Sequence, residues 1–203
     1  MDKKDHILEV AEELFAEHGF EGTSTRMLAT KAGVNLAMIS YYFGSKEKLF
    51  EEMVDRKTSG ILEKLQMLNE SPSDPWTKFE TLIDIYTDRI LNNHRFHKIL
   101  GREISLQQRS VISTTLMNRK LRNAQEMRKL IENGIETKAF RPVDIPLTLA
   151  TLLGTLSQMI QSHKFACMLM GDDPSHCNID DKAVRTRIKD HLKKLFKAHL
   201  LNQ

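Results

Sequence analysis

Glycine and capping residues divide the first fifty residues into short helical segments, and this punctuation constrains the fold most strongly. Apolar residues recur at helical spacing from Ile7 to Phe15, and Gly19 follows where that pattern stops. Gly33 ends a second short pattern, and the Asn35 side chain can cap a third. The chain is therefore predicted to begin with three short helices and a glycine turn between the second and third, which is the make-up of a helix-turn-helix.

The remainder of the chain shows helical periodicity and lacks the alternating patterns and Asn-Gly or Asp-Gly turns of β-hairpins. Asp74 followed by Pro75 is a strong start signal for one of the later helices. The fold class is predicted to be all-α with about nine helices: a helix-turn-helix domain over residues 1–48, then a helical bundle over 49–203. The expected later helices cover 46–68 (which connects the two domains), 75–90, 94–105, 110–137, 144–170 and 180–200.

Composition places the chain among ordinary globular proteins, because 40% of its residues are hydrophobic and 28% are charged. Two cysteines, Cys167 and Cys177, are too few for a disulfide framework and suit a reducing compartment. No stretch approaches the roughly 18 apolar residues that a membrane span needs, and the N-terminus is amphipathic without an apolar signal core. We therefore expect a cytoplasmic protein with no membrane partner.

The distribution of charge indicates a nucleic-acid surface better than the net charge of +3 does. Residues 1–50 carry eight acidic and six basic residues, but no acidic residue falls between positions 22 and 46. That window holds the bases Arg26, Lys31 and Lys46. It is the segment we expect to face DNA.

Residues 7–50 resemble the DNA-binding signature of the tetracycline-repressor (TetR) family of transcriptional regulators. The resemblance is carried, with the spacing kept throughout, by LFAEHGF at 14–20, GTSTR at 22–26, LA at 28–29, AGVN at 32–35 and ISYYFGSKEKLF at 39–50. It implies a ligand-responsive regulator, most simply a repressor, that binds a palindromic double-stranded operator as a homodimer. It also implies that a small-molecule effector, which we expect to be lipophilic, enters the body, shifts the helix at 46–68 and so releases the operator.

The resemblance assigns roles within the helix-turn-helix. One position departs from it, because Ser40 stands where the family usually has tyrosine, so that a backbone contact is lost or moved to Tyr41. The tyrosines could instead be packing residues, and Leu36 and Met38 could belong to a core, but Ile39 and Phe43 are better core candidates. The implied base-reading residues are Asn35, Leu36, Ala37, Met38, Tyr41 and, on the second helix, Arg26; the implied phosphate contacts are Ser24, Thr25, Tyr42 and Lys46.

Two further sets of residues are expected in the body. The last two long helices carry wide apolar stripes that predict a four-helix dimer interface, the alternative being that the stripes pack only within one chain. The dimer candidates are Leu149, Leu152, Leu153, Leu156, Met159, Ile160, Ile188, Leu192, Leu195 and Phe196. The effector-pocket candidates are Phe79, Ile83, Tyr86, Phe96, Leu100, Met117 and Leu121, with Glu103 either an anchor for a cationic ligand or a partner in a structural salt bridge.

Alternatives from other classes have less support in the sequence. No phosphate-binding glycine loop, nucleophile elbow or His-Glu-x-x-His pattern indicates an enzyme, and no cofactor is expected. A helical adaptor without DNA binding would be expected to have a degraded recognition helix. A metal or redox site formed by His163, Cys167, His176 and Cys177 would match no recognised ligand spacing, so no metal is expected.

Overall fold

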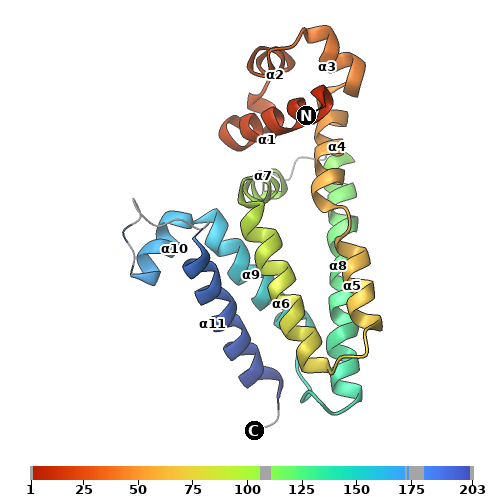
Figure 1. The fold of residues 1–203 in the computed structure, drawn as a ribbon, viewed down its shortest axis with the longest axis vertical. Coiled ribbons are helices and arrows are strands. Elements are labelled where there is room, and N and C mark those ends of the chain that lie inside the picture. Colours follow the sequence, from red (N-terminus) through yellow and green to blue (C-terminus); the bar gives the residue numbers. More distant parts are fainter. Residues whose placement is uncertain (1, 106–110, 172, 174–180, 202–203) are drawn as a thin grey trace. The chain divides into compact units, whose positions relative to one another are not determined.

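The computed structural model describes residues 2–105, 111–171, 173 and 181–201, and the described residues form helices joined by turns, with no strand among them (Figure 1). The all-α prediction is confirmed. The predicted helix starts at Asn35 and Asp74 are also found, because each side chain accepts a backbone N–H at the start of a helix. Ser24 and Ser45 cap α2 and α4 in the same way. The helices are α1 (Lys3–Gly22), α2 (Thr25–Ala32), α3 (Leu36–Phe43), α4 (Lys46–Thr58), α5 (Ile61–Glu70), α6 (Pro75–Asn92), α7 (His94–Ser105), α8 (Val111–Glu136), α9 (Ile145–Gln161), α10 (His163–Met170) and α11 (Lys182–Leu200).

Two segments that were expected to be continuous helices are divided. The helix predicted over 46–68 breaks between α4 and α5, where Gly60 takes the left-handed conformation with φ 73°. Only glycine adopts that conformation without steric cost, so Gly60 itself causes the break. The break was not predicted, because the apolar periodicity is helical on both sides of Gly60. The helix predicted up to residue 170 breaks at Ser162, whose φ of −123° and ψ of 48° are not helical.

The chain folds into two compact units. We call residues 1–59 with 95–119 the head unit, and residues 60–94 with 120–203 the body unit. The head unit therefore extends beyond the boundary expected at residue 48, since it includes α4, α7 and the beginning of α8. The chain passes between the units at three places, after residues 59, 94 and 119.

The head unit is built around phenylalanine rings. Phe15, Phe20 and Phe50 contact one another with centroids 5.2–5.5 Å apart. Phe96 and Leu100 of α7 belong to the same buried cluster and are at most 2% exposed. A small three-helix domain buries little apolar surface by itself, so α4 and α7 enlarge the core on which α1, α2 and α3 rest.

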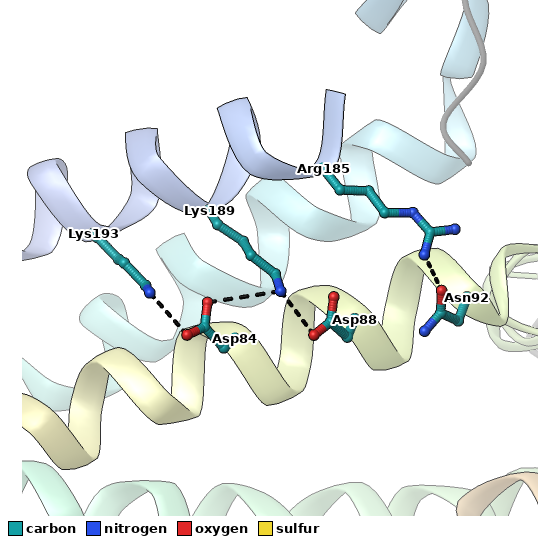
Figure 2. Close-up of polar contacts among 6 residues, drawn as sticks. All are labelled: Asp84, Asp88, Asn92, Arg185, Lys189 and Lys193. Atoms are coloured by element: carbon teal, nitrogen blue, oxygen red, sulfur yellow. Dashed lines mark hydrogen bonds and ion pairs between the residues drawn. The ribbon is translucent and has the colours of Figure 1, made fainter. Parts of the chain in front are cut away.

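The body unit packs α6 against α11 in antiparallel orientation, with apolar residues between them and an ion-pair ladder along the side (Figure 2). Asp84 contacts Lys193 at 2.8 Å, and Asp88 contacts Lys189 at 2.7 Å. Arg185 and Asn92 extend the ladder by a further turn. Partly exposed pairs of this kind contribute about 0.5 kcal/mol each, so they select the register of the two helices more than they stabilise the fold.

The end of α8 is closed by a contact between a glycine and an aromatic ring. The Phe140 N–H donates to the Gly134 carbonyl at 2.8 Å, and the buried Phe140 ring lies over the glycine. A Cβ atom added at Gly134 would lie 2.1 Å from Phe140 Cδ2. The glycine is therefore required by close packing in a helix that would otherwise favour alanine.

The Gly134→Ala substitution is expected to lower the free energy of unfolding by about 1–3 kcal/mol, because the added methyl group displaces the Phe140 ring. The neighbouring Asn133→Ala substitution, at an exposed position of α8, is the control and is expected to be neutral or slightly stabilising. Urea unfolding of both variants at one protein concentration measures the difference. Equal stability of the two variants would show that the ring moves aside without cost.

Candidate nucleic-acid interface

The α2–α3 hairpin of the head unit is determined by local contacts. The Ser24 hydroxyl accepts the Met27 N–H at 3.1 Å and so caps α2. Gly33 ends α2 in the left-handed conformation with φ 62°. Asn35 Oδ1 then accepts the Ala37 N–H at 2.9 Å and caps α3. These residues are adjacent in sequence, which is why their roles could be predicted.

The third helix has one buried side and one exposed side. Ile39 and Phe43 are at most 5% exposed and join the core of the head unit, as expected. Leu36 is 41% exposed and Tyr41 is 83% exposed. Side chains that are this open, on a helix whose other face is buried, are available to a partner. The exposed residues of α3 are Leu36, Ala37, Ser40 and Tyr41, while Met38 is half-buried.

The two tyrosines have different surroundings. Tyr42 is half-buried and packs on the core cluster of the head unit, whereas the Tyr41 ring projects outward and meets the edge of Tyr42 with centroids 5.3 Å apart. Tyr42 thus supports the helix, and Tyr41 is placed to touch a partner. Among the implied contacts of α2, Arg26 is exposed and Thr25 is half-buried.

The expected phosphate contact at Lys46 has a different role in the structure. Lys46 Nζ donates to the carbonyls of Phe20 at 2.8 Å and Thr23 at 3.1 Å, and it lies 4.2 Å above the centroid of the Phe20 ring. Two of its three N–H donors are thereby engaged within the protein. No local sequence pattern predicts this contact, because the partners lie 26 and 23 residues away along the chain.

The acidic residues of α1 are paired with bases from neighbouring helices. Glu12 contacts Lys57 at 2.7 Å and Glu13 contacts Lys31 at 3.1 Å. The Arg56 guanidinium donates to Asp5, and this hydrogen bond holds the pKa of the Asp5 carboxyl below its usual 3.8. These pairs partly neutralise the acidic charge of α1, and the Glu13–Lys31 pair also offsets one basic charge of α2.

The structure does not bring the expected effector-pocket residues together. Phe79, Ile83 and Tyr86 belong to the core of the body unit, where burial raises the pKa of Tyr86 to about 12. Phe96 and Leu100 instead belong to the core of the head unit. The side chains of Met117 and Leu121 are 51% and 57% exposed. Five of the seven apolar candidates are thus divided between two cores, and sequence spacing could not show to which core each belongs.

Glu103 is also placed differently from its expected role. Its carboxylate oxygen Oε1 accepts the Phe20 N–H at 3.3 Å. It contacts the backbone at the end of α1.

Seven of the ten expected dimer residues lie inside one chain. Leu149, Leu152, Leu156, Ile160, Ile188, Leu192 and Phe196 are 0–7% exposed and form part of the core of the body unit. Leu153 and Met159 are partly buried, and Leu195 is 42% exposed. These buried residues pack within one chain, where α9 and α11 turn their apolar sides towards α6.

A cavity of about 1070 Å³ lies among α9, α10 and α11. Its lining includes none of the expected effector-pocket residues. Met159, Leu169 and Ile188 supply apolar lining, and Arg187, His191 and Lys194 supply polar lining.

The metal alternative gains no support from the described part of the chain, in which no three His, Cys, Asp or Glu residues are grouped as metal ligands. Cys167 Sγ lies 3.6 Å from His163 Nε2, while His176 and Cys177 fall outside the described residues. Within the same described ranges, no helix combines the length and the apolar character that crossing a bilayer requires.

The comparisons with known proteins identify the family. The family described as "Bacterial regulatory proteins, tetR family" matches residues 7–53, which cover the head-unit segment from α1 into α4. The probable HTH-type transcriptional regulator YttP of Bacillus subtilis (strain 168) is 33% identical over 149 residues, which make up 70% of each chain. The chain belongs to the TetR family of transcriptional regulators.

Other relatives and solved structures agree with this assignment. The HTH-type transcriptional repressor NicS of Pseudomonas putida is 32% identical over 100 residues, or 49% of this chain and 47% of that protein. The ketosteroid transcriptional regulator KstR2 of Mycobacterium tuberculosis has the same fold, with a TM-score of 0.80 at 17% identity over 100% of this chain and 96% of that one. This TetR-family protein is therefore a helix-turn-helix, DNA-binding regulator.

Asn35 allows the stability of the recognition helix to be separated from its charge. The Asn35→Asp substitution keeps the cap and is favoured by the helix dipole, so the thermal unfolding temperature should be unchanged or higher. Its new negative charge on the DNA-facing surface should lower DNA affinity at least about tenfold. Thermal unfolding and fluorescence-anisotropy binding to DNA measure the two effects.

The Asn35→Ala substitution provides the contrast, because it removes the cap at a cost of about 1 kcal/mol without adding charge. If Asn35→Asp bound DNA as tightly as the unaltered protein, the start of α3 would not lie near the phosphates.

Proposed function

We propose that this TetR-family regulator is a repressor that binds a palindromic operator as a homodimer and releases it when a small lipophilic effector binds to the body unit. The observation that carries the proposal is the surface of α2 and α3. It has no acidic residue between positions 22 and 46, and it exposes Arg26, Leu36 and Tyr41 on helices whose other faces are buried.

The exposed side chains suit the grooves of B-DNA. An arginine at position 26 can contact guanine with two hydrogen bonds, and the apolar Leu36 and Ala37 can meet thymine methyl groups. We assign base contacts to Arg26, Leu36, Ala37 and Met38, and phosphate contacts to Thr25 and the Tyr41 hydroxyl. Ser40 is exposed beside Tyr41. Tyr41 is therefore placed to make the contact with the DNA backbone that the family resemblance implies for a tyrosine at position 40.

The dimer is proposed to form through the outer face of α9 and α11, which differs from the buried stripe first expected. TetR-family regulators usually act as dimers, and two recognition helices must reach successive major grooves about 34 Å apart. The outer face offers Leu147 of α9, 65% exposed, Leu195 of α11, 42% exposed, and Gly154 of α9, where an added Cβ would meet no atom within 4 Å. The open cavity among α9, α10 and α11 adjoins this face, and we propose a second copy of the chain as its occupant.

The effector is proposed to act through the three chain crossings between the units. The crossings after residues 59 and 94 lie at the ends of helices, whereas the crossing after residue 119 lies inside α8. We propose that a change in the body unit reaches the head unit along these covalent connections, and a small displacement of recognition helices is enough to lose base contacts. A lipophilic class is supported by the transcriptional regulator FadR from Bacillus subtilis, which has the same fold, with a TM-score of 0.66, and was solved in complex with stearoyl-CoA.

Selection of binding sites from random double-stranded DNA tests the repressor proposal. The protein at physiological salt should recover a palindrome with two half-sites, because a two-fold dimer presents two identical recognition helices. The recovered operator should then be released by long-chain acyl-CoA added at micromolar concentration. Weak binding to all sequences, lost as salt rises, would contradict sequence-specific regulation, and an operator insensitive to acyl-CoA would contradict this effector class.

The outer-face dimer is tested by the Gly154→Arg substitution. A long charged side chain at this position should prevent the close approach of a second copy, so the protein should become monomeric and lose at least about tenfold in operator affinity. Asn133→Arg, which adds the same charge at an exposed position of α8, is the matched control. Light scattering coupled to size-exclusion chromatography gives the mass, and a Gly154→Arg protein that remains dimeric would place the interface elsewhere.

A further inference from the structure

Residues 19–23, which we call the α1–α2 turn, determine where α2 and α3 begin. The turn starts at Gly19, whose φ of 77° and ψ of 171° interrupt the helical path of α1. Thr23 ends it with a fully buried side chain, whose hydroxyl donates to the Gly19 carbonyl at 2.8 Å. The turn therefore carries polar backbone groups beside a core of phenylalanine rings, and these groups need partners.

Two charged side chains from outside the helix-turn-helix supply partners to the same residue of the turn. Lys46, the first residue of α4, donates to the Phe20 carbonyl at 2.8 Å and to the Thr23 carbonyl at 3.1 Å. Glu103, near the end of α7, accepts the Phe20 N–H at 3.3 Å. The two peptide groups that flank Phe20 are thus held from two different helices. Hydrogen bonds to charged groups are the stronger class, and both pairs are shielded from water in part.

The end of α7 also covers the turn sterically. A Cβ atom added at Gly19 would lie 2.7 Å from Arg102 Cζ, so the guanidinium rests directly on the glycine. Phe96, Ile99 and Leu100 of the same helix are buried in the core of the head unit. Polar, steric and apolar contacts therefore all join α7 to the α1–α2 turn.

We propose that Lys46 and Glu103 are positioning residues for operator recognition. They fix the α1–α2 turn, and through it the placement of α2 and α3, and this placement is what they contribute to DNA binding. This reassigns Lys46 from a phosphate contact and Glu103 from an effector contact. The inference rests on the DNA binding of the head unit and is independent of the proposed effector and dimer face.

Glu103 gives the sharpest test, because a purely electrostatic role and a positioning role predict changes of opposite sign in the DNA affinity of Glu103→Ala. Removing an acidic residue from a DNA-binding unit raises DNA affinity if its charge matters alone. If Glu103 positions the turn, Glu103→Ala leaves the Phe20 N–H without its acceptor and should lower operator affinity about tenfold. Glu103→Gln keeps an acceptor oxygen at the same place, so it should recover most of that loss.

The comparison between operator and unrelated DNA separates positioning from simple loss of folded protein. A misplaced recognition helix weakens binding to the operator but leaves phosphate attraction to unrelated DNA unchanged. A smaller folded fraction weakens both by the same factor. Anisotropy titrations with the two DNAs, on protein whose thermal unfolding is also recorded, give the ratio directly.

Lys46 is tested against Lys48, an exposed lysine of the same helix whose removal changes the charge equally. Lys46→Met should lower operator affinity several-fold more than Lys48→Met does, because only Lys46 holds the turn. The slope of log K against log salt should be reduced no more in Lys46→Met than in Lys48→Met. Loss of a phosphate contact would instead reduce that slope by about 0.9 per contact. Combining Lys46→Met with Glu103→Ala should give less than the sum of the two losses, since both act on Phe20.

Three results would overturn the inference. Glu103→Ala could bind the operator as well as or better than the unaltered protein; it could weaken both DNAs equally; or Lys46→Met could match Lys48→Met in affinity and lose the slope of a phosphate contact. In each case the unaltered protein still binds its operator, so the outcome is distinct from a failure of the proposed repressor function.

Discussion

Contact among Phe15, Phe20 and Phe50 is the interaction on which the head unit depends. The three rings come from α1, from the α1–α2 turn and from α4, and their centroids lie 5.2–5.5 Å apart. They bring together segments whose helices are too short to be stable alone. Because Phe20 lies inside the turn, burying its ring also draws polar backbone into the core region. The bonds from Lys46 and Glu103 follow from that requirement.

The same requirement joins the DNA-binding helices to the rest of the chain. The α7 helix supplies apolar residues to the core of the head unit and a carboxylate to the α1–α2 turn, and its first residues follow directly on α6 of the body unit. A helix-turn-helix that was stable by itself would not be affected by ligand binding in another part of the chain. Here the core that stabilises recognition helices includes a helix that begins at a crossing between units. This is a physical basis for regulation by a bound effector.

The body unit uses its apolar surface differently. The wide apolar stripes of α9 and α11 pack against α6. An ion-pair ladder of Asp84, Asp88, Lys189 and Lys193 lies along the side of α6 and α11 (Figure 2). Their outer face carries glycine, alanine, threonine and charged residues with a few exposed apolar side chains. Such a surface is only moderately apolar, which is ordinary for protein interfaces outside their centres. The association proposed for this face would depend on shape, and therefore on the small residues around Gly154.

The sequence by itself determined the local features of this protein. Gly33, Ser24, Asn35 and Asp74 act on neighbours within three residues, so the helix ends, the helix-turn-helix and the TetR family could be recognised from the printed chain. Only the tertiary structure decided which apolar residues share a core and which charges meet. A stripe at helical spacing looks the same whether it faces its own chain, a second copy or a ligand, and Glu103 lies 83 residues from the Phe20 N–H that it accepts. Such contacts depend on which distant segments the tertiary fold brings together, and no local sequence pattern predicts that.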